Sequence, residues 1–416
     1  MLTCWENRTS RECAPSRRSA HSPSHHPLDS SGSATKLAGY AVAVFVLDIL
    51  LVVLGLALLI GGGEALVRGA STIAVKMGIS PLVIGLIVVS AATSAPELAV
   101  TLGAVGEGEP GLAIGNVVGS NIANILLVLG FSAVAAPILI KRQVVRFDVP
   151  VMVGLTVAAL LVSWDGRISA IDGLFLLGGL VAHAIVSVIW GKRNGAEPPE
   201  QPETLPLNAS PVAVWLALAL LVVGVGLLVV GSRVLVTGAV NIATALGVSG
   251  LVVGLTVVAI GTSLPELATS IVAIRRGERD MAVGNIVGSN IFNIGLVLGL
   301  SAIVFGDGIP VPAPAISLDM PLMLAASIAL FPVALRGFVI VRWEGAMFAG
   351  LYTAYMVYVV LSATGHEALQ GYTAVMLWFV LPLIAVTLIA LAAYEIGMNR
   401  GKRQAGDDRE GKSPAT

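Results

Sequence analysis

The side chains that could carry chemistry lie inside apolar stretches, and they occur in two matching sets. The first set is the run TSAPELA at 93–99, and the second is TSLPELA at 262–268. Each run places a glutamate, Glu97 or Glu266, three residues after a Thr-Ser pair. A carboxylate in so apolar a segment is costly to bury unless it is paired or binds a cation. Both runs therefore indicate ion binding.

Each set has a second part, in which amides and a hydroxyl recur every four residues. These rows are Asn116, Ser120 and Asn124 in the first set and Asn285, Ser289 and Asn293 in the second. Residues four apart share one face of a helix, so each row is expected to line a common surface. Asn121 and Asn290 fall on another face, and we interpret them as structural.

A proline in each first part predicts a broken helix. Pro96 lacks the N–H that a helix requires, and its ring clashes with the carbonyl four residues earlier, so the helix should break near Ala92 and Thr93. Pro265 predicts the same in the second set. In a membrane, such a break is tolerated only where it is buried in protein or lines a cavity. The freed carbonyl oxygens would then add to the hydroxyls and carboxylates.

The collected groups are hard oxygen ligands. They suit Ca²⁺, Na⁺ or another hard cation, whereas zinc or copper would favour nitrogen or sulfur. The only cysteines, Cys4 and Cys13, lie in the polar N-terminal tail, which excludes thiolate sites and cysteine catalysis in the apolar body. The apolar stretches also contain no nucleophile–base pair and no paired aspartates, so we do not expect an enzyme.

The composition is that of a membrane protein. Of the 416 residues, 56% are hydrophobic and 12% charged, against about 25% charged in soluble domains. The net charge of −1 and the lack of a basic face give no indication of a nucleic-acid partner. We expect a multi-pass protein in contact with the lipid bilayer, and no obligatory protein partner is inferred.

The two sets belong to a long internal repeat. A constant offset of 169 residues aligns 78–133 with 247–302 without a gap, and more than half of the aligned positions are identical. About 20 apolar residues cross a bilayer, which predicts eleven spans, at 39–62, 79–105, 111–136, 148–164, 169–190, 211–231, 248–274, 281–305, 317–335, 345–364 and 373–395. Five spans per repeat is an odd number, so the second copy should enter the membrane from the opposite face.

The predicted fold is therefore an all-α membrane protein with an inverted repeat of five plus five helices, broken at the midplane, and an eleventh C-terminal helix. The expected parts are a disordered tail (1–38), a first repeat (39–190), a linker (191–210), a second repeat (211–364), an extra helix (373–395) and a basic, polar tail (396–416). Glu64, Arg68 and Arg233, near the ends of spans one and six, are interpreted as interfacial rather than as ligands.

Basic residues predict the orientation. The ends that follow odd-numbered spans, together with the C-terminal tail, hold 17 of the 24 lysines and arginines. Because basic loops stay cytoplasmic, we expect insertion in the cell (inner) membrane with the N-terminus outside and the C-terminus inside.

The repeated runs resemble the two alpha-repeats of the sodium/calcium exchanger family of cation antiporters. The resemblance is carried by GTSLPELATS and GNIVGSNIFN within 261–293 and by their mirrored copy at 92–124, and it extends over about residues 39–364. It implies a prokaryotic-type antiporter that works by alternating access and exports Ca²⁺ with the Na⁺ gradient, with Ca²⁺ and Na⁺ as transported ions and no cofactor. A Ca²⁺/H⁺ exchanger and, from another class, a cation channel are the alternatives; H⁺ or K⁺ could replace Na⁺ as coupling ion.

The resemblance also implies a set of ligands. Glu97 and Glu266 would form the central Ca²⁺ site, completed by Asn124 and Asn293. The flanking Na⁺ sites would use Thr93, Ser94, Ser120, Thr262, Ser263 and Ser289, with the carbonyls of Ser90 and Ala259. This chain departs from the family at two points: it has Asn at 293 where some members have Asp, and Ala92 where its own second copy has Gly261.

Overall fold

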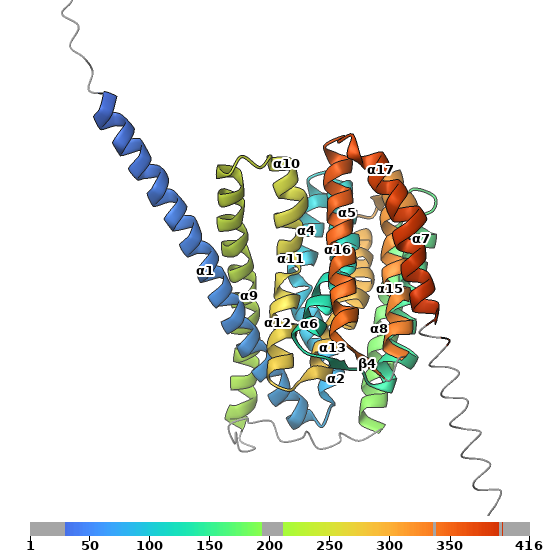
Figure 1. Cartoon of the computed structure of the whole chain (residues 1–416). Helices are drawn as coiled ribbons and strands as arrows, with labels where there is room; N and C mark the ends of the chain where they lie inside the picture. Colours follow the sequence, from blue (N-terminus) through green and yellow to red (C-terminus); the bar gives the residue numbers. More distant parts are fainter. Residues whose placement is uncertain (1–29, 194–210, 336–337, 391–392, 394–416) are drawn as a thin grey trace, which may run out of the picture. The chain divides into compact units, whose positions relative to one another are not determined.

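The structure is a computed structural model that describes residues 30–193, 211–335, 338–390 and 393. The chain divides into two compact units, Met1–Val46 and Leu47–Thr416. Within the described residues, ten helices are long and apolar enough to cross a membrane. A bent pair of helices, Thr256–Thr262 and Leu264–Arg275, forms one further span, the seventh along the chain. The all-α membrane fold is thus confirmed (Figure 1).

The first repeat contains α1 (Ser30–Met77), α2 (Pro81–Ile84), η1 (Gly85–Val89), α3 (Ser90–Thr93), α4 (Ala95–Gly106), α5 (Pro110–Ala123), η2 (Asn124–Leu129), α6 (Gly130–Ala135), β1 (Ile138–Leu139), η3 (Val144–Asp148), α7 (Val149–Val162), β2 (Arg167–Ile168) and α8 (Ala170–Arg193). The second contains α9 (Pro211–Ala245), α10 (Gly250–Val253), η4 (Gly254–Val258), α11 (Ala259–Thr262), α12 (Leu264–Arg275), α13 (Arg279–Phe292), η5 (Asn293–Leu298), α14 (Gly299–Val304), β3 (Ile309–Pro310), η6 (Ala315–Asp319), α15 (Met320–Leu335), β4 (Val339–Ile340) and α16 (Arg342–Ala363). The eleventh span contains α17 (Ala368–Val375) and η7 (Met376–Val380). Elements labelled η are π-helices.

Two small strand pairs show that the repeats are inverted. β1 follows the third span and β3 follows the eighth, so they are equivalent; β2 and β4 are equivalent in the same way. Yet β1 pairs with β4, and β2 pairs with β3. Equivalent loops therefore lie at opposite faces, as the odd number of spans predicts. An ion pair agrees with this, because Lys141 after the third span meets Asp280 at the start of the eighth at 2.8 Å.

The first and sixth spans are longer than predicted. The predicted spans end at residues 62 and 231, but the helices continue to Met77 and Ala245. Charged residues do not end these helices, because Glu64 is paired within its helix by Arg68, whose Nη2 donates to Oε1 at 2.8 Å. Arg233 is exposed, which lets its long side chain place the charge in a polar setting.

The predicted disordered tail needs correction at its end. Helix α1 begins at Ser30, within the predicted 1–38 segment. Extending an existing helix adds one hydrogen bond for each residue that becomes ordered, so the helix of the first span can continue into the residues that precede it. Residues 1–29, the linker beyond Arg193 and the tail 396–416 lie outside the described residues, while the linker residues 191–193 end helix α8.

Helices α1 and α9 are joined along a glycine seam. Its members recur every seven residues and match across the repeat: Gly55, Gly62 and Gly69 on α1 with Gly224, Gly231 and Gly238 on α9. A Cβ at any of them would come within 3 Å of the facing backbone; at Gly62, for example, it would lie 2.8 Å from Leu228 N. Glycines permit such contact between membrane helices. The two helices thus form a closely packed pair, and α1 crosses α9 obliquely in Figure 1.

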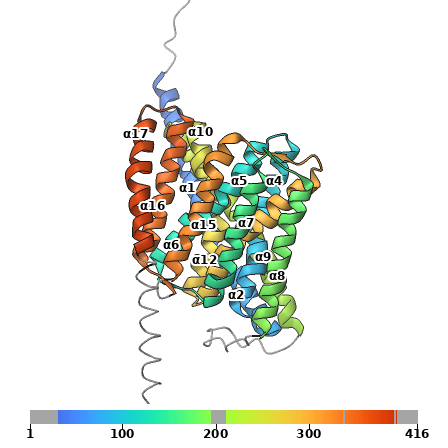
Figure 2. The same cartoon turned by 90° about the vertical axis from the view of Figure 1, so that its right-hand side faces the viewer.

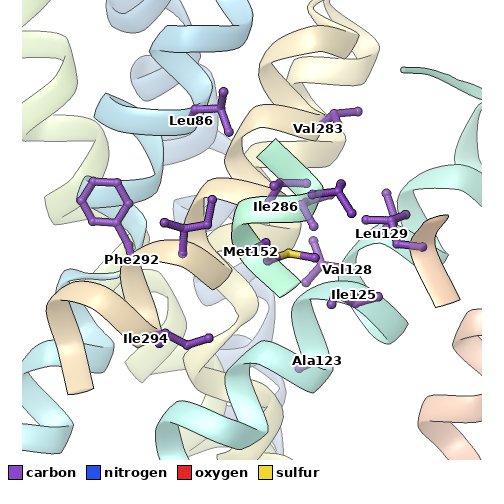
Figure 3. Packing of buried hydrophobic residues seen from close by; sticks show 14 of the residues in the cluster. Leu86, Ala123, Ile125, Val128, Leu129, Met152, Val283, Ile286, Phe292 and Ile294 are labelled. Atoms are coloured by element: carbon purple, nitrogen blue, oxygen red, sulfur yellow. The ribbon is translucent and has the colours of Figure 1, made fainter. Parts of the chain in front are cut away.

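The interior of the second unit is built on α5 and α13 with their π-helical continuations. Every described residue from Met281 to Asn293 is buried. Figure 3 shows Leu86 of η1, Ile286 of α13, Ile125 of η2 and Met152 of α7 packing together. In Figure 2, α7 and α8 are seen on one side of the bundle and α16 and α17 on the other. This core fixes the helices that carry the repeated polar residues.

The seam gives a prediction with a built-in control. We expect Gly62→Ala to lower the free energy of unfolding by about 1–3 kcal/mol, since the new methyl group must displace backbone. We expect the neighbouring Gly61→Ala to raise it by about 0.5–1 kcal/mol, because the space there is open and Ala favours helix. Thermal unfolding of the detergent-solubilised variants measures both. Equal shifts in the same direction would contradict the seam.

Candidate cation site

The two predicted helix breaks are present, one residue later than expected. Ser94 separates α3 from α4 with φ −82° and ψ 0°, and Ser263 separates α11 from α12 with φ −89° and ψ 3°. The two parts of the seventh span meet at 54°. In each case the proline occupies the first turn of the second helix, where its missing N–H is tolerated. The glutamate then lies one residue further along.

A π-helical turn flanks each motif, which the sequence patterns did not predict. η1 and η4 precede the two breaks, while η2 begins at Asn124 and η5 at Asn293. Such turns are frequent at functional sites. Their appearance at equivalent positions in both repeats marks the same four segments that the motifs mark.

The two carboxylates are fully buried without partners. Glu97 and Glu266 are each 0% exposed, and no described group bonds to any of their four oxygens. The segments that carry them meet across the repeats, because α12 contacts α3, the helix directly before α4. Leaving buried polar atoms unsatisfied costs about 1–3 kcal/mol for each group, and more for charges. A bound cation would satisfy both.

The same pattern holds for five of the ten other predicted ligands. Among these ligands, the following buried atoms have no hydrogen-bond partner in the described part of the chain: Ser94 Oγ, Ser120 Oγ, Asn124 Oδ1 and Nδ2, Ser263 Oγ and Asn293 Oδ1. The segments that carry them touch across the repeats, because α4 packs on η5 and α12 on η2. Ordinary native interiors satisfy nearly all buried polar groups. This concentration of free oxygens fits a cation of the kind the donor types suggest.

The remaining predicted residues differ between the repeats. Thr93 is buried, and its hydroxyl lies 3.3 Å from Ser289 Oγ, which joins two predicted ligands from different repeats. Thr262 is half-buried, and its hydroxyl donates to the carbonyl of Ala259 at 3.2 Å. Ser90 is 0% exposed, whereas its counterpart Ala259 is exposed. The first repeat is thus enclosed at this point and the second is open.

Asn116 and Asn285, the first members of the two polar rows, support the site from outside the predicted ligand set. Asn116 Nδ2 donates to the backbone carbonyl of Glu97 at 3.1 Å and to Thr101 Oγ1 at 3.0 Å. In the second repeat, Asn285 Nδ2 donates to Ser270 Oγ at 3.2 Å. The first amides of the two rows therefore hold the glutamate helices in place. The hydroxyl shared by positions 101 and 270 was the signal that could have revealed this.

Two further contacts act on the site itself. Asn293 Nδ2 donates to Asn121 Oδ1 at 3.3 Å, which leaves Asn293 Oδ1 free, so Asn121 positions a predicted ligand. Ser232 of α9 donates to the carbonyl of Gly261 at 2.5 Å. That carbonyl is the one freed by Pro265, four residues later. The equivalent of Ser232 is Gly63, which has no hydroxyl to give to Ala92.

The glycines of the second motif show the same asymmetry more strongly. A Cβ on Gly284 would meet Leu82 O at 2.5 Å, and one on Gly288 would meet Leu86 O at 2.5 Å. The equivalent glycines, Gly115 and Gly119, have nothing within 4 Å of the same position. We call the end of the bundle where α2 and η1 pack against α13 the closed face. The opposite end, where α10 and η4 are not packed closely against α5, is the open face. Exposure agrees, because Val89 is 0% and its counterpart Val258 is 44% exposed.

Comparison with known proteins shows the family of this chain. The family model described as sodium/calcium exchanger protein matches residues 47–188 and 216–361. The sodium/calcium exchanger MaX1 of Methanosarcina acetivorans is 31% identical, over 74% of this chain and 97% of its own. A putative antiporter, CaxA, of Alkalimonas amylolytica is 42% identical, over 68% of this chain and 89% of its own.

A solved structure is also similar. The sodium-calcium exchanger NCX_Mj, soaked with Na⁺ and Ca²⁺, superposes with a TM-score of 0.64 and 34% identity, covering 75% of this chain and 98% of that one. The family match spans both repeats, and the fold match spans almost the whole of the solved chain. The protein is a multi-pass membrane transporter, not an enzyme, and it belongs to the sodium/calcium exchanger family of antiporters.

Proposed function

We propose that this antiporter exchanges Na⁺ for Ca²⁺ at a single central site and uses inward Na⁺ movement to export Ca²⁺. The observation that carries the proposal is the cluster of buried, unpartnered oxygens around Glu97 and Glu266. Both the solved relative and MaX1 are described as sodium/calcium exchangers. Ca²⁺ accepts six to eight oxygens in flexible geometry, which this mixed donor set can supply.

In this proposal the ions share ligands. Glu97 and Glu266 hold Ca²⁺ with Asn124 and Asn293. Na⁺ is held by the same two carboxylates together with the hydroxyls and the backbone carbonyls of Ser90 and Ala259. Two carboxylates balance one Ca²⁺, and asparagine at both 124 and 293 adds no further charge. Since both ions need the same carboxylates, occupancy is mutually exclusive, and this competition couples the two fluxes.

The difference between the closed and open faces supports alternating access. Two repeats of matching sequence pack differently at equivalent glycines, so each arrangement is available to either repeat. Exchanging the two arrangements would open the opposite face to the site. We propose that the pair α1–α9, joined by its glycine seam, is the part that moves. With the N-terminus outside, the open face is the external one.

The first prediction concerns the carboxylates. We expect Glu97→Gln and Glu266→Gln each to abolish Ca²⁺ flux, because each variant removes one of the two negative charges that compensate for the loss of the ion's hydration shell. Ca²⁺ should also cease to raise the unfolding temperature, since a ligand stabilises only the fold that binds it. Vesicle flux and thermal unfolding measure the two effects, with the exposed Glu109→Gln as control. Flux near that of the parent chain would remove the carboxylates from the site.

The second prediction concerns the coupling ion. In vesicles loaded with Na⁺, we expect Ca²⁺ uptake to follow the Na⁺ gradient and to be independent of imposed pH and K⁺ gradients. Each gradient is varied separately while the membrane potential is clamped. Uptake that followed the pH gradient alone would assign H⁺ as the coupling ion, and uptake without any counter-ion would indicate a channel.

The third prediction tests alternating access. Gly119→Ala fits the present arrangement, where its Cβ meets open space, but clashes in the exchanged one, as Gly288 shows. We therefore expect the variant to fold and bind Ca²⁺, measured by calorimetry, while its vesicle flux is lost. Gly103→Val is the matched control, because Gly103 is equally open and its counterpart is Val272. Normal flux in Gly119→Ala would contradict the exchange of arrangements.

A further inference from the structure

An ion pair ties helix α1 to the turn between α12 and α13. Arg276 Nε donates to Glu64 Oε2 at 2.8 Å, and its Nη2 also contacts Oε1. Beside it, Ser71 Oγ of α1 donates to Glu278 Oε1 at 3.1 Å. The hydrogen bond to Glu64 raises the pKa of Arg276, so its charge persists at any physiological pH. Two-point guanidinium–carboxylate contacts are directional as well as attractive.

The repeat places a second pair at the equivalent positions with the charges exchanged. The offset that aligns the two copies puts Arg233 of α9 at the position of Glu64. It puts Glu107, in the turn between α4 and α5, at the position of Arg276. A basic residue on the helix and an acidic one in the turn are as complementary as the reverse. Both pairs therefore place an acidic residue opposite a basic one, although the acidic residue is on the helix in one pair and in the turn in the other.

The two pairs differ in the present structure in the way the two faces differ. The pair Glu64–Arg276 is formed at the closed face, where α13 begins and Met281 is 0% exposed. At the open face, Leu112, the counterpart of Met281, is 58% exposed. Arg233 and Glu107 are both exposed there, and neither takes part in an ion pair between described residues.

We propose that these pairs are alternate latches of the transport cycle. Glu64–Arg276 holds α1–α9 over the closed face, and Glu107–Arg233 forms when the other face closes. Each step from one state to the other breaks one pair and makes the other. The inference rests on the alternating access of the proposed function and adds the residues that set the balance between its states.

The latches are not identical. When the first opens, Glu64 keeps Arg68, four residues along its own helix, as a partner. The residue equivalent to Arg68 is Thr237, which offers Arg233 no charge. Breaking the first latch therefore leaves its carboxylate paired, while breaking the second leaves its guanidinium to solvent. Glu278 has a partner in Ser71, whereas the equivalent of Ser71 is Val240, so the auxiliary contact belongs to the first latch alone.

Thiol accessibility tests the latches. In the full chain carrying Cys4→Ser and Cys13→Ser, V89C and V258C serve separately as reporters for the two faces. Both are labelled with N-ethylmaleimide in vesicles without ion gradients. Arg276→Gln should raise the labelling rate of the V89C reporter about threefold or more and lower that of V258C, in line with the loss of one partly exposed ion pair. Glu107→Gln should shift both rates in the opposite directions.

The controls carry the same charge changes without the contacts. Arg275→Gln, beside Arg276 and exposed, and Glu109→Gln, beside Glu107 in the turn, should leave both rates unchanged. The double variant Glu64→Arg with Arg276→Glu should return the rates towards those of the parent, since it restores attraction with signs reversed. The latches would be overturned if Arg276→Gln and Glu107→Gln changed the labelling rates in the same direction, or if neither variant changed them.

The labelling uses no transported ion, so it distinguishes this inference from the proposed function. If labelling shifts as expected but Ca²⁺ uptake follows the proton gradient, the latches are supported and H⁺ is the coupling ion. Unshifted labelling in a chain with Na⁺-driven uptake would keep the exchanger and remove the latches.

Discussion

Two carboxylates without partners in an apolar interior are the constraint on which the rest of this structure depends. Glu97 and Glu266 are completely buried and make no hydrogen bond to any described group. Such a pair is tolerated in a folded protein only where a cation or a proton can be supplied. Asn121 orients the amide of Asn293 so that its Oδ1 stays available, and the hydroxyls of Ser94, Ser120 and Ser263 have no competing partner among the described residues. The fold therefore holds two buried carboxylates whose charge a bound cation or a proton would neutralise.

The duplication explains why these carboxylates lie at the centre of the bundle and why the two faces can be packed differently. An inverted repeat brings each motif to the middle of the bundle from opposite faces, as the pairing of β1 with β4 and β2 with β3 requires. Matching sequences have matching packing options, and here they have adopted different ones: Gly284 and Gly288 are in contact while Gly115 and Gly119 are not. One face is therefore closely packed and the other is open, although the two repeats match in sequence.

The helices α1 and α9 follow the symmetry more closely than the site does. Their seam is built from glycines on both helices at equivalent positions, and the contacts are equally close on each side. Backbone-to-backbone contact of this kind is stiff, because no side chain can rearrange to relieve it. The polar groups at its borders, Ser232 and Glu64, reach the second repeat's break and turn. The pair is therefore linked to the helices around the site at identifiable points.

The sequence alone determined the class of protein, the inverted repeat, the two breaks and the matching sets of polar residues within the spans. These follow from local properties: apolar length, the chemistry of proline, and residue types repeated at a fixed offset. It missed the extension of α1 and α9, since charges that look like a helix end are paired or exposed. It also missed the positioning roles of Asn121, Asn116 and Ser232.

Only the tertiary structure decided which repeat is closed, because a symmetric sequence cannot state which of two equivalent packings its halves adopt. The partners of Glu64 and Asn293 lie 212 and 172 residues away in the chain, and no local pattern specifies contacts of that kind.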